Sequence, residues 1–448
     1  MKINTSRSSY TLIPRLGLLV NSEIENEFQS LYPDSQEINE EQLIERLRTD
    51  LTDEEIEQHI CSSRNLVLNI TENCNFRCKY CAYSGIYESN RIHNDRKMEL
   101  STSKKAVDLF FKNLANRKRK VKINSISVGF YGGEPLLEFS LIKDIYMYTK
   151  EKITKTEMDR LFDLQFRVST NGYLLYKEEI VDFLVKNNIG IDVSLDGPKE
   201  EHDKFRVTIN MENSWETIWE NLNSLYNKFP EYSSKNITYL ATIHPMHNYK
   251  KIDRFFLENP KRFDITGLLV NKVSKSFLKE SLKKKWFGQE SLQTSQLINI
   301  KNKASFDRKF TLKKISSNSK FTAMCFPGEI KLFVSTDGKI FICERVKQEI
   351  SIGNVDDGFD YDAIRKVQRL WNEEIIKNRC WECPARTLCH FCVSHSEDKE
   401  GIRLDCNYKS RFQNSLSNYL SYKEYEIINA SSLPKYSETS VKEYFKQL

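Results

Sequence analysis

The sequence predicts an α/β fold: an open, partial (β/α)6 TIM-like barrel with a small N-terminal module and a cysteine-rich C-terminal domain. Two observations lead to this prediction. From Asn65 onward, apolar β-branched runs alternate with amphipathic stretches, the pattern of right-handed βαβ units around a parallel sheet. Six such units favour an open barrel over a closed eight-stranded one. Seven of the 11 cysteines fall within residues 321–412, where few long helices are expected, so metals would have to hold that segment together.

Length and composition are those of a folded cytoplasmic protein. The chain has 448 residues, which at roughly 100–200 residues per domain predicts two or three domains. Hydrophobic residues make up 39%, with 26 Phe and 21 Tyr, enough for a sizeable core. No apolar run approaches the ~20 residues of a membrane span, and the polar start Met1–Thr5 lacks a signal-peptide core.

Each element of the predicted barrel has its own sequence signal. Residues 1–64 form the N-terminal module, with a strand-like stretch at 10–20 and a charged helical stretch at 39–60. Residues 65–270 form the barrel. Its expected strands are 65–70, 125–131, 165–169, 190–195, 237–243 and 265–270, and its expected helices lie near 102–116, 139–153, 175–187, 214–227 and 248–257.

Three segments follow the barrel. Residues 271–320 are polar and lysine-rich and are expected to be a linker, 321–412 form the cysteine-rich domain, and 413–448 form a partly helical tail. The net charge of +6 is concentrated at 117–120 and 272–285. A solvated helix face is the favoured interpretation of these clusters, ahead of a dock for an acidic peptide. No nucleic-acid-binding motif accompanies them.

The chemistry is carried by a cysteine loop directly after the first expected strand. Cys74, Cys78 and Cys81 follow the spacing C-x3-C-x2-C, with the aromatic Tyr80 before the third cysteine. Three thiolates on one short loop can bind three irons of a [4Fe–4S] cluster and leave the fourth iron open. A zinc site would need a fourth Cys or His nearby, and His93 is twelve residues past Cys81.

With the loops that follow, this motif resembles the radical S-adenosylmethionine (SAM) superfamily over roughly 65–270. After the second strand stands a segment similar to the family's GGEP motif, which contacts the SAM amino group: Gly132, Gly133, Glu134 and Pro135. After the third strand, Ser169 and Asn171 occupy the position that contacts the SAM ribose or carboxylate.

The loops after the fourth and fifth strands complete the resemblance. Ser194 and Asp196 lie in the segment Ser-Leu-Asp-Gly-Pro, and Arg206 follows; the resemblance implies that Ser194 and Arg206 meet the SAM carboxylate. Thr242 ends the fifth strand and is expected to line the adenine pocket. The implied reaction is reductive cleavage of SAM to a 5′-deoxyadenosyl radical that abstracts hydrogen from substrate, with an electron donor such as flavodoxin or ferredoxin.

The C-terminal cysteines resemble a SPASM domain, which carries auxiliary iron–sulfur clusters. The resemblance implies that Cys380, Cys383, Cys389 and Cys406 hold one complete cluster, and that Cys325, Cys343 and Cys392 hold a second one. The fourth iron of this second cluster would be open, or bound by a non-cysteine side chain or by substrate. Only two residues separate Cys389 from Cys392, where the family usually has three. A zinc ribbon is the alternative for this segment. Cys61 lies outside both groups and is expected to be a structural thiol.

Glu344 follows Cys343 and is a possible catalytic base, because relatives that mature sulfatases have Asp there. The stretch from Cys81 to Tyr87, with Arg91 and His93, resembles maturases of ribosomally made peptides.

We therefore expect a radical SAM peptide maturase that installs thioether or carbon–carbon cross-links in a precursor peptide. The N-terminal module would be a reduced domain that recognises the leader of this precursor. A sulfatase-maturating enzyme and a non-catalytic iron–sulfur electron-transfer protein are the alternatives. Neither nucleic acid nor membrane is an expected partner.

Overall fold

The structure is a computed structural model. It describes residues 40–87, 91–117, 125–259, 326–344, 348 and 350–380, together with the backbone of six short strands at 2–4, 9–13, 18–21, 269–272, 397–398 and 401–402. Among the described helices, none combines the length and the apolar character that crossing a membrane requires.

A parallel sheet forms the centre of the molecule and confirms the predicted fold class. Its six strands are hydrogen-bonded in chain order: β4 (Asn65–Thr71), β5 (Ser125–Gly132), β6 (Asp163–Thr170), β7 (Gly190–Ser194), β8 (Ile237–Ile243) and β9 (Leu269–Lys272). The first five begin within two residues of the expected positions, whereas β9 begins four residues later than expected. Fully buried residues such as Leu66, Val128 and Ile191 line these strands and form the core.

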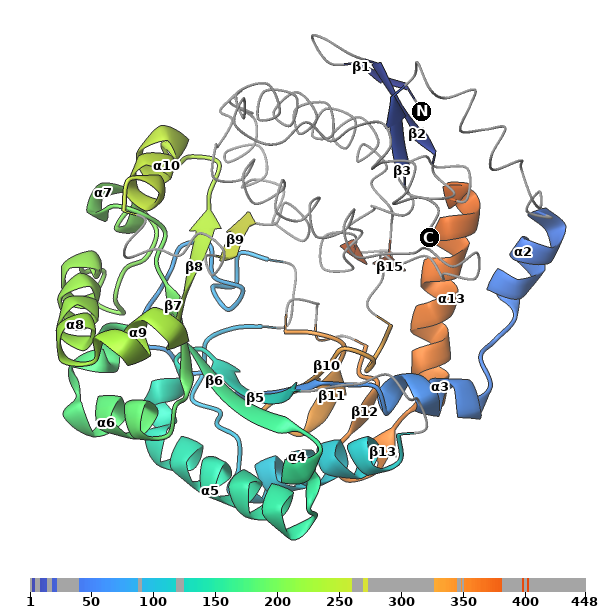
Figure 1. Ribbon diagram of the computed structural model, residues 1–448, viewed down its shortest axis with the longest axis horizontal. Helices are drawn as coiled ribbons and strands as arrows, with labels where there is room; N and C mark the ends of the chain where they lie inside the picture. The colour runs from blue at the N-terminus through green and yellow to red at the C-terminus, as the bar shows by residue number, and fades with distance from the viewer. Residues whose placement is uncertain are drawn as a thin grey trace, which may run out of the picture.

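Helices form an outer layer around the strands (Figure 1). They are α4 (Leu100–Ala115), α5 (Phe139–Lys155), α6 (Glu178–Lys186), α7 (Lys199–His202), α8 (Trp215–Lys228), α9 (Pro230–Asn236) and α10 (Tyr249–Leu257), with 3-10 turns η2 (Pro135–Glu138), η3 (Met158–Arg160) and η4 (Tyr173–Tyr176). Helix α6 begins later than its expected start at 175. Gly172 adopts a left-handed φ of 79°, and the buried Leu174 and Leu175 follow it in η4 rather than in the helix.

The cysteine-rich segment extends the barrel sheet. Strand β10 (Lys331–Val334) pairs in parallel with β4 on the side away from β5, and antiparallel strands β11 (Lys339–Phe341), β12 (Gly353–Asn354) and β13 (Gly358–Phe359) follow it. A long helix, α13 (Tyr361–Lys377), comes next and was not among the expected elements. Its start is capped by Asp360, whose side chain accepts the Ala363 N–H at 2.9 Å.

The N-terminal residues form a three-stranded antiparallel sheet of β1 (Lys2–Asn4), β2 (Ser9–Ile13) and β3 (Leu18–Asn21). The next described helices are α2 (Glu40–Arg48) and α3 (Asp53–Ile60), and α3 starts with a capping box between Thr52 and Glu55. Ile56 and Ile60 of α3 join the main core, whereas α2 buries no residue and lies along α13 (Figure 1).

The remaining described strands, β14 (Glu397–Asp398) and β15 (Gly401–Ile402), pair with each other. The expected linker from residue 273 onward and the expected tail, 413–448, lie outside the described residues, as does most of both basic clusters. The domain boundaries stay predictions.

Candidate cluster and SAM site

Paired glycines at the end of β5 hold the cluster loop, residues 72–81, which follows β4. Gly133 donates its N–H to Thr71 O at 2.8 Å, and Glu134 donates its N–H to Asn73 O at 2.9 Å. A Cβ on Gly133 would lie 2.1 Å from Asn73 O, and one on Gly132 would lie 2.2 Å from Thr71 O. These glycines therefore have a packing role in addition to the expected one beside SAM.

The three cysteines of the loop lie close enough to interact electrostatically. Each sulfur has a hydrogen-bond donor: the Phe76 N–H is 3.3 Å from Cys74 Sγ, the Tyr83 N–H is 3.4 Å from Cys81 Sγ, and the Arg206 guanidinium donates to Cys78. Burial raises the pKa of all three thiols, that of Cys78 to about 12. Buried thiols with N–H donors pointing at them suit thiolates whose charge a bound metal compensates.

The three cysteines offer the donors that an iron–sulfur cluster requires. In a [4Fe–4S] cluster each thiolate binds a different iron, and three thiolates on one short loop can bind three of the four. The donor set of Cys74, Cys78 and Cys81 therefore fits the expected cluster.

Glu134 connects the loops after β5 and β6. Its fully buried carboxylate accepts hydrogen bonds from the Thr170 hydroxyl at 2.8 Å, the Asn171 N–H at 2.7 Å and the Leu136 N–H at 3.1 Å. Burial raises the pKa of Glu134 to about 7, against the effect of these donors. Asn171 in turn donates from Nδ2 to Asn75 Oδ1 at 2.8 Å, so the loop after β6 also contacts the cluster loop.

Asp196 joins several of the loops that carry the expected SAM residues. Its carboxylate accepts from the Tyr80 hydroxyl and from the Thr242 N–H at 2.8 Å, and it forms an ion pair with Arg206, whose Nε lies 2.9 Å from Oδ2. The Asp196 N–H donates to His202 Nδ1 at 3.3 Å. It therefore joins the cluster loop, the carboxyl ends of β7 and β8, and the segment around Arg206. Arg206, expected to meet the SAM carboxylate, ion-pairs with Asp196 and lies 5.4 Å from the centre of the Tyr80 ring.

The charges around Asp196 are buried and mutually dependent. Burial would raise the pKa of Asp196, yet the charge of Arg206 keeps it below its usual value. Burial lowers the pKa of His202 to about 3 and that of His244 to about 3, so both imidazoles are neutral at physiological pH.

The other predicted SAM residues gather at the same edge of the sheet. Ser169, Ser194 and Thr242 are partly exposed near the carboxyl ends of β6, β7 and β8, and Pro135 is buried at the start of η2. Because carboxyl ends of neighbouring parallel strands meet at one edge, this placement is what a ligand site there requires.

Glu344 and Cys343 lie just after β11. Lys331 Nζ is 2.9 Å from both carboxylate oxygens of Glu344, and the Cys343 thiol donates to Glu344 Oε2 at 3.4 Å. Only 14% of the Glu344 side chain is exposed. Lys331 thus competes with a substrate for the Glu344 carboxylate, which is the predicted base.

Sequence reasoning missed the contacts that join this segment to the cluster loop. The Thr336 hydroxyl donates to Glu72 Oε1 at 2.8 Å, and Arg91 donates to the carbonyl of Glu344. Arg91 stands out in the sequence only as part of the maturase-like stretch, and Glu72 and Thr336 carry no sequence signal at all.

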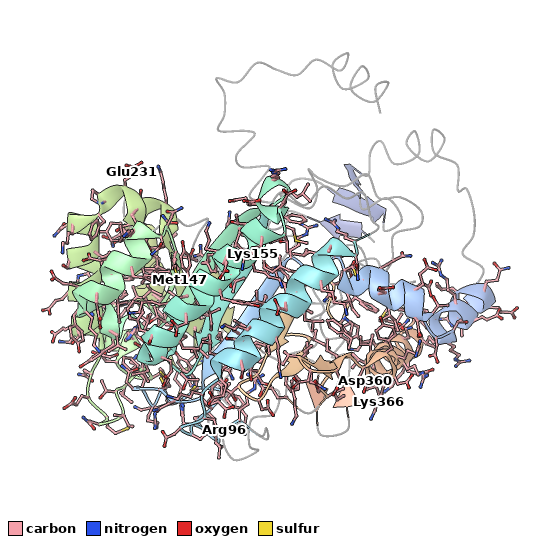
Figure 2. The ribbon with its side chains drawn as sticks, turned by 90° about the horizontal axis from the view of Figure 1, so that it is seen from below. Arg96, Met147, Lys155, Glu231, Asp360 and Lys366 are labelled. Atoms are coloured by element: carbon pink, nitrogen blue, oxygen red, sulfur yellow. The ribbon has the colours of Figure 1, made fainter. Side chains whose placement is uncertain are left out.

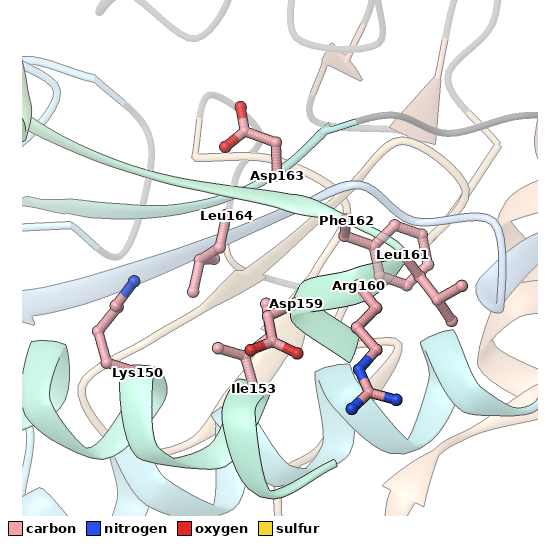
Figure 3. Close-up of a pocket in the computed structure, with 8 residues that line it drawn as sticks. All are labelled: Lys150, Ile153, Asp159, Arg160, Leu161, Phe162, Asp163 and Leu164. Atoms are coloured by element: carbon pink, nitrogen blue, oxygen red, sulfur yellow. The ribbon is translucent and has the colours of Figure 1, made fainter. Parts of the chain in front are cut away.

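Five predicted cluster ligands lie outside the described residues: Cys325, Cys383, Cys389, Cys392 and Cys406. Cys380 is described, three residues after the end of α13, and is partly buried. A separate hollow of about 390 Å³ is lined by Lys150, Asp159, Arg160 and Asp163 among others (Figure 3). It lies at the amino end of β6, the opposite end of the sheet from the cluster loop, so we assign it no part in the reaction.

Comparison with known proteins places this site in a family. Residues 68–257 match the Radical SAM superfamily. A cysteine-type anaerobic sulfatase-maturating enzyme of Clostridium novyi (strain NT) is 27% identical over 199 residues, 44% of this chain and 49% of that enzyme. The chain thus matches about half the length of that relative. A second such enzyme, from Clostridium perfringens (strain 13 / Type A), is 23% identical over 391 residues, covering 82% of this chain and 98% of the relative.

The solved structure of native anSMEcpe with bound AdoMet has the same fold. It superposes with a TM-score of 0.57 at 18% identity and covers 82% of this chain and 99% of its own. Barrel, cluster loop and matched segment together define an enzyme that works with SAM and a [4Fe–4S] cluster. Residues 68–257 thus form the barrel of a radical SAM enzyme, and the chain is similar to anaerobic sulfatase-maturating enzymes.

Proposed function

We propose that this enzyme modifies a ribosomally made precursor peptide, installing thioether or carbon–carbon cross-links. The observation that carries the proposal is the attachment of the Cys343–Glu344 segment to the catalytic edge of the barrel. Arg91 and the Thr336–Glu72 hydrogen bond make this attachment directly beside the cluster loop. A peptide held between the two segments would lie between the radical source and Cys343.

The chain's own residues would bind and orient the cofactors. Cys74, Cys78 and Cys81 would hold the cluster, which with SAM supplies the radical that abstracts hydrogen. Asp196 holds Arg206 and Tyr80 in place, and this pre-ordering lowers the cost of binding a charged ligand. The buried aromatic wall of Tyr80 and Phe205 would exclude water from the same side.

The C-terminal cysteines would hold the auxiliary clusters. In this proposal Cys380, Cys383, Cys389 and Cys406 bind one cluster completely, and Cys325, Cys343 and Cys392 bind another with one iron open. An open iron beside the radical source could ligate a substrate thiolate, which suits thioether formation. The combination of an open iron that could bind the thiolate with a radical source is the reason for favouring a thioether over a carbon–carbon bond.

The N-terminal sheet offers a means of holding a leader peptide. Strand β3 pairs only with β2 among the described strands, so it is an outer strand of the three-stranded sheet. Outer strands bind extended peptides by strand addition. A precursor held there by its leader would present its core segment to the barrel.

Sulfatase maturation is the second candidate, and the names of the similar enzymes favour it. A structure of anSMEcpe with the Cp18Cys peptide bound has the same fold, with a TM-score of 0.56, which supports a peptide substrate for either function. Glu344 in place of the Asp expected for that function, and the additional N-terminal elements β1–β3, favour the precursor-peptide proposal. The match to the Radical SAM superfamily disfavours a purely electron-transferring protein.

One anaerobic experiment separates these functions. The reconstituted enzyme is incubated with SAM, dithionite and either the short peptide encoded beside its gene or a sulfatase-derived peptide, and free thiols are then alkylated. Loss of two hydrogens with a protected cysteine in the first peptide supports thioether formation. The same loss with alkylated cysteines indicates a carbon–carbon link. A hydrazide-reactive aldehyde in the sulfatase peptide, with the first peptide unchanged, would replace our proposal with sulfatase maturation.

A further inference from the structure

A tyrosine at the carboxyl end of β5 points into the barrel. Its neighbour Phe130 stacks on Phe166 of β6 with ring centres 6.2 Å apart, and Phe166 packs on Tyr146 of α5 at 4.7 Å, so Phe130 faces the helical layer. Successive side chains of a strand point to opposite faces, which turns Tyr131 to the inner face of the sheet. There its ring makes an edge-to-face contact with Phe333 of β10, with ring centres 6.0 Å apart.

The Tyr131 side chain is accessible although protein atoms surround it. Part of its surface is exposed, unlike that of the buried Phe130 and Phe333. Burial nevertheless raises the pKa of Tyr131 far above the usual value of a tyrosine, so its hydroxyl keeps its proton. The accessible part of the side chain therefore lies inside the barrel and presents a neutral hydroxyl.

The phenol lies within electrostatic range of both segments that the proposed function places around the substrate. After burial, the nearby groups that affect the pKa of Tyr131 are Tyr83, Glu344, Arg91 and Cys81. Cys81 belongs to the cluster loop, and Glu344 belongs to the segment after β11. Arg91 connects the two segments, because its guanidinium lies 5.9 Å from the centre of the Tyr83 ring and donates to the Glu344 carbonyl.

The polar side chains beside Tyr131 are already engaged. The Tyr83 hydroxyl accepts from Asn69 Nδ2 at 3.3 Å. The Glu344 carboxylate accepts from Lys331. Within the part of the chain that the structure describes, the Tyr131 hydroxyl makes no hydrogen bond. A hydroxyl that is held in place by packing and has no partner within the protein suits an acceptor that arrives with a ligand.

We propose that the Tyr131 hydroxyl donates a hydrogen bond to a backbone carbonyl of the substrate peptide and so positions the residue from which hydrogen is abstracted. The inference rests on the proposed function, because it requires a peptide that reaches the inside of the barrel. A backbone carbonyl fits the neutral donor, and every residue of a peptide carries one. The nearby Glu344 would repel a substrate carboxylate in the same place. Hydrogen abstraction depends on holding the reacting atoms in register, which is what this contact contributes.

The test removes the hydroxyl and keeps the ring. Reconstituted wild type and Tyr131→Phe are incubated with SAM, dithionite and the short peptide encoded beside the gene. We expect the KM for the peptide to rise roughly threefold to tenfold, the effect of one lost hydrogen bond, and more 5′-deoxyadenosine to form per modified peptide. Calorimetric titration of the peptide onto the unreduced, SAM-bound enzyme should show the same loss of affinity.

The variant should leave the cofactors untouched. Iron content and calorimetric SAM binding of Tyr131→Phe are expected to equal those of wild type. The matched control is Tyr148→Phe, which removes a hydroxyl that donates to Asp108 at 2.9 Å in the helical layer. This control should keep the wild-type KM and the wild-type ratio of 5′-deoxyadenosine to modified peptide.

Two results would overturn the proposal. An unchanged KM and an unchanged ratio in Tyr131→Phe would show that the hydroxyl does not contact the peptide. Lower iron content or weaker SAM binding in this variant would show that the hydroxyl supports the cofactor site instead. A wild-type enzyme that leaves the precursor peptide unmodified but converts the sulfatase-derived peptide would refute the proposed function. The same comparison with that second peptide then decides the role of Tyr131, because it also presents backbone carbonyls.

Discussion

Asp196 shows how a single buried carboxylate can organise the residues of a candidate binding site. The Tyr80 hydroxyl and the Thr242 N–H donate to it, Arg206 forms an ion pair with it, and its side chain is fully buried. We therefore interpret Asp196 as a positioning residue, whereas the sequence placed it among the residues that contact SAM.

Replacing Asp196 by Asn should be costly. Arg206 would keep its charge in a buried site without its partner, so we expect a loss of about 3–5 kcal/mol in the free energy of unfolding, together with weaker SAM binding. Urea unfolding and calorimetric titration of SAM measure the two effects. Asp192→Asn, on strand β7 just before the Asp196 loop, is the control. Its partner Arg167 is 34% exposed, so that change should cost about 1 kcal/mol or less. Equal costs would refute the special role of Asp196.

The burial of His202 predicts that the stability of the fold decreases in acid. Its pKa is lowered from 6.5 to about 3 by burial, so below pH 6.5 the unfolded chain binds a proton that the folded chain does not. Stability is then full above pH 6.5 and falls with pH, by about 2 kcal/mol between pH 6.5 and about pH 5 from this one residue.

The substitution His202→Gln should flatten this part of the pH dependence, as measured by urea unfolding of the full-length chain across that range. His93, whose pKa is lowered but whose side chain is only partly buried, provides a control through His93→Gln. A His202 variant with the wild-type slope would contradict the prediction.

At the scale of elements, the glycine pair decides how closely β5 approaches the cluster loop. The position that Gly133 occupies has no room for a Cβ, because the obstructing atom, Asn73 O, belongs to the backbone and cannot rotate away. Gly129 on the same strand is different: a Cβ there would meet Val67 Cγ2 at 3.5 Å, an ordinary contact.

This difference gives a paired prediction. Gly133→Ala should displace the cluster loop and lower the iron and sulfide content of the reconstituted protein several-fold. Gly129→Ala should bind iron and sulfide as the wild type does, and its free energy of unfolding should lie within about 1 kcal/mol of the wild-type value. Iron and sulfide assays with urea unfolding measure both. Normal loading of Gly133→Ala would show that the loop has more freedom than the structure indicates.

At the scale of the whole molecule, polar contacts join the N-terminal helices to α13. Helix α2 buries none of its residues, so it has no hydrophobic face that packs on the core. The polar contacts with α13 hold it instead. They include the ion pairs of Arg369 with Asp50, Arg365 with Asp53, Arg379 with Glu40 and Arg48 with Glu373, and the hydrogen bond from Asn372 to the Leu47 carbonyl at 2.7 Å.

Charge reversal should therefore release α2 without unfolding the barrel. We expect Arg369→Glu/Arg379→Glu to speed amide hydrogen exchange in α2 by roughly tenfold while global stability changes by about 1 kcal/mol or less, because exposed ion pairs contribute little each. Lys366→Glu, an exposed residue of the same helix (Figure 2), is the control for the change in charge. Unaltered exchange in α2 would show that other contacts hold it.

The sequence by itself determined the repeating βα pattern and the cluster loop, because the spacing of apolar residues and the spacing of the cysteine ligands are local properties of the chain. It also contained the signal for α13, in the helical spacing of Ile364, Val367, Trp371 and Ile375, but the cysteines around that segment led to the expectation of few long helices.

Only the tertiary structure decided which distant segments meet. Arg91 and Glu344 are 253 residues apart, and the pairing of β10 with β4 that brings them together follows from no local pattern. Likewise, Arg206 can pair with a ligand or with Asp196, and the sequence does not distinguish the two. A charged side chain takes the partner that the assembled backbone places within reach, and that geometry exists only after the sheet has formed.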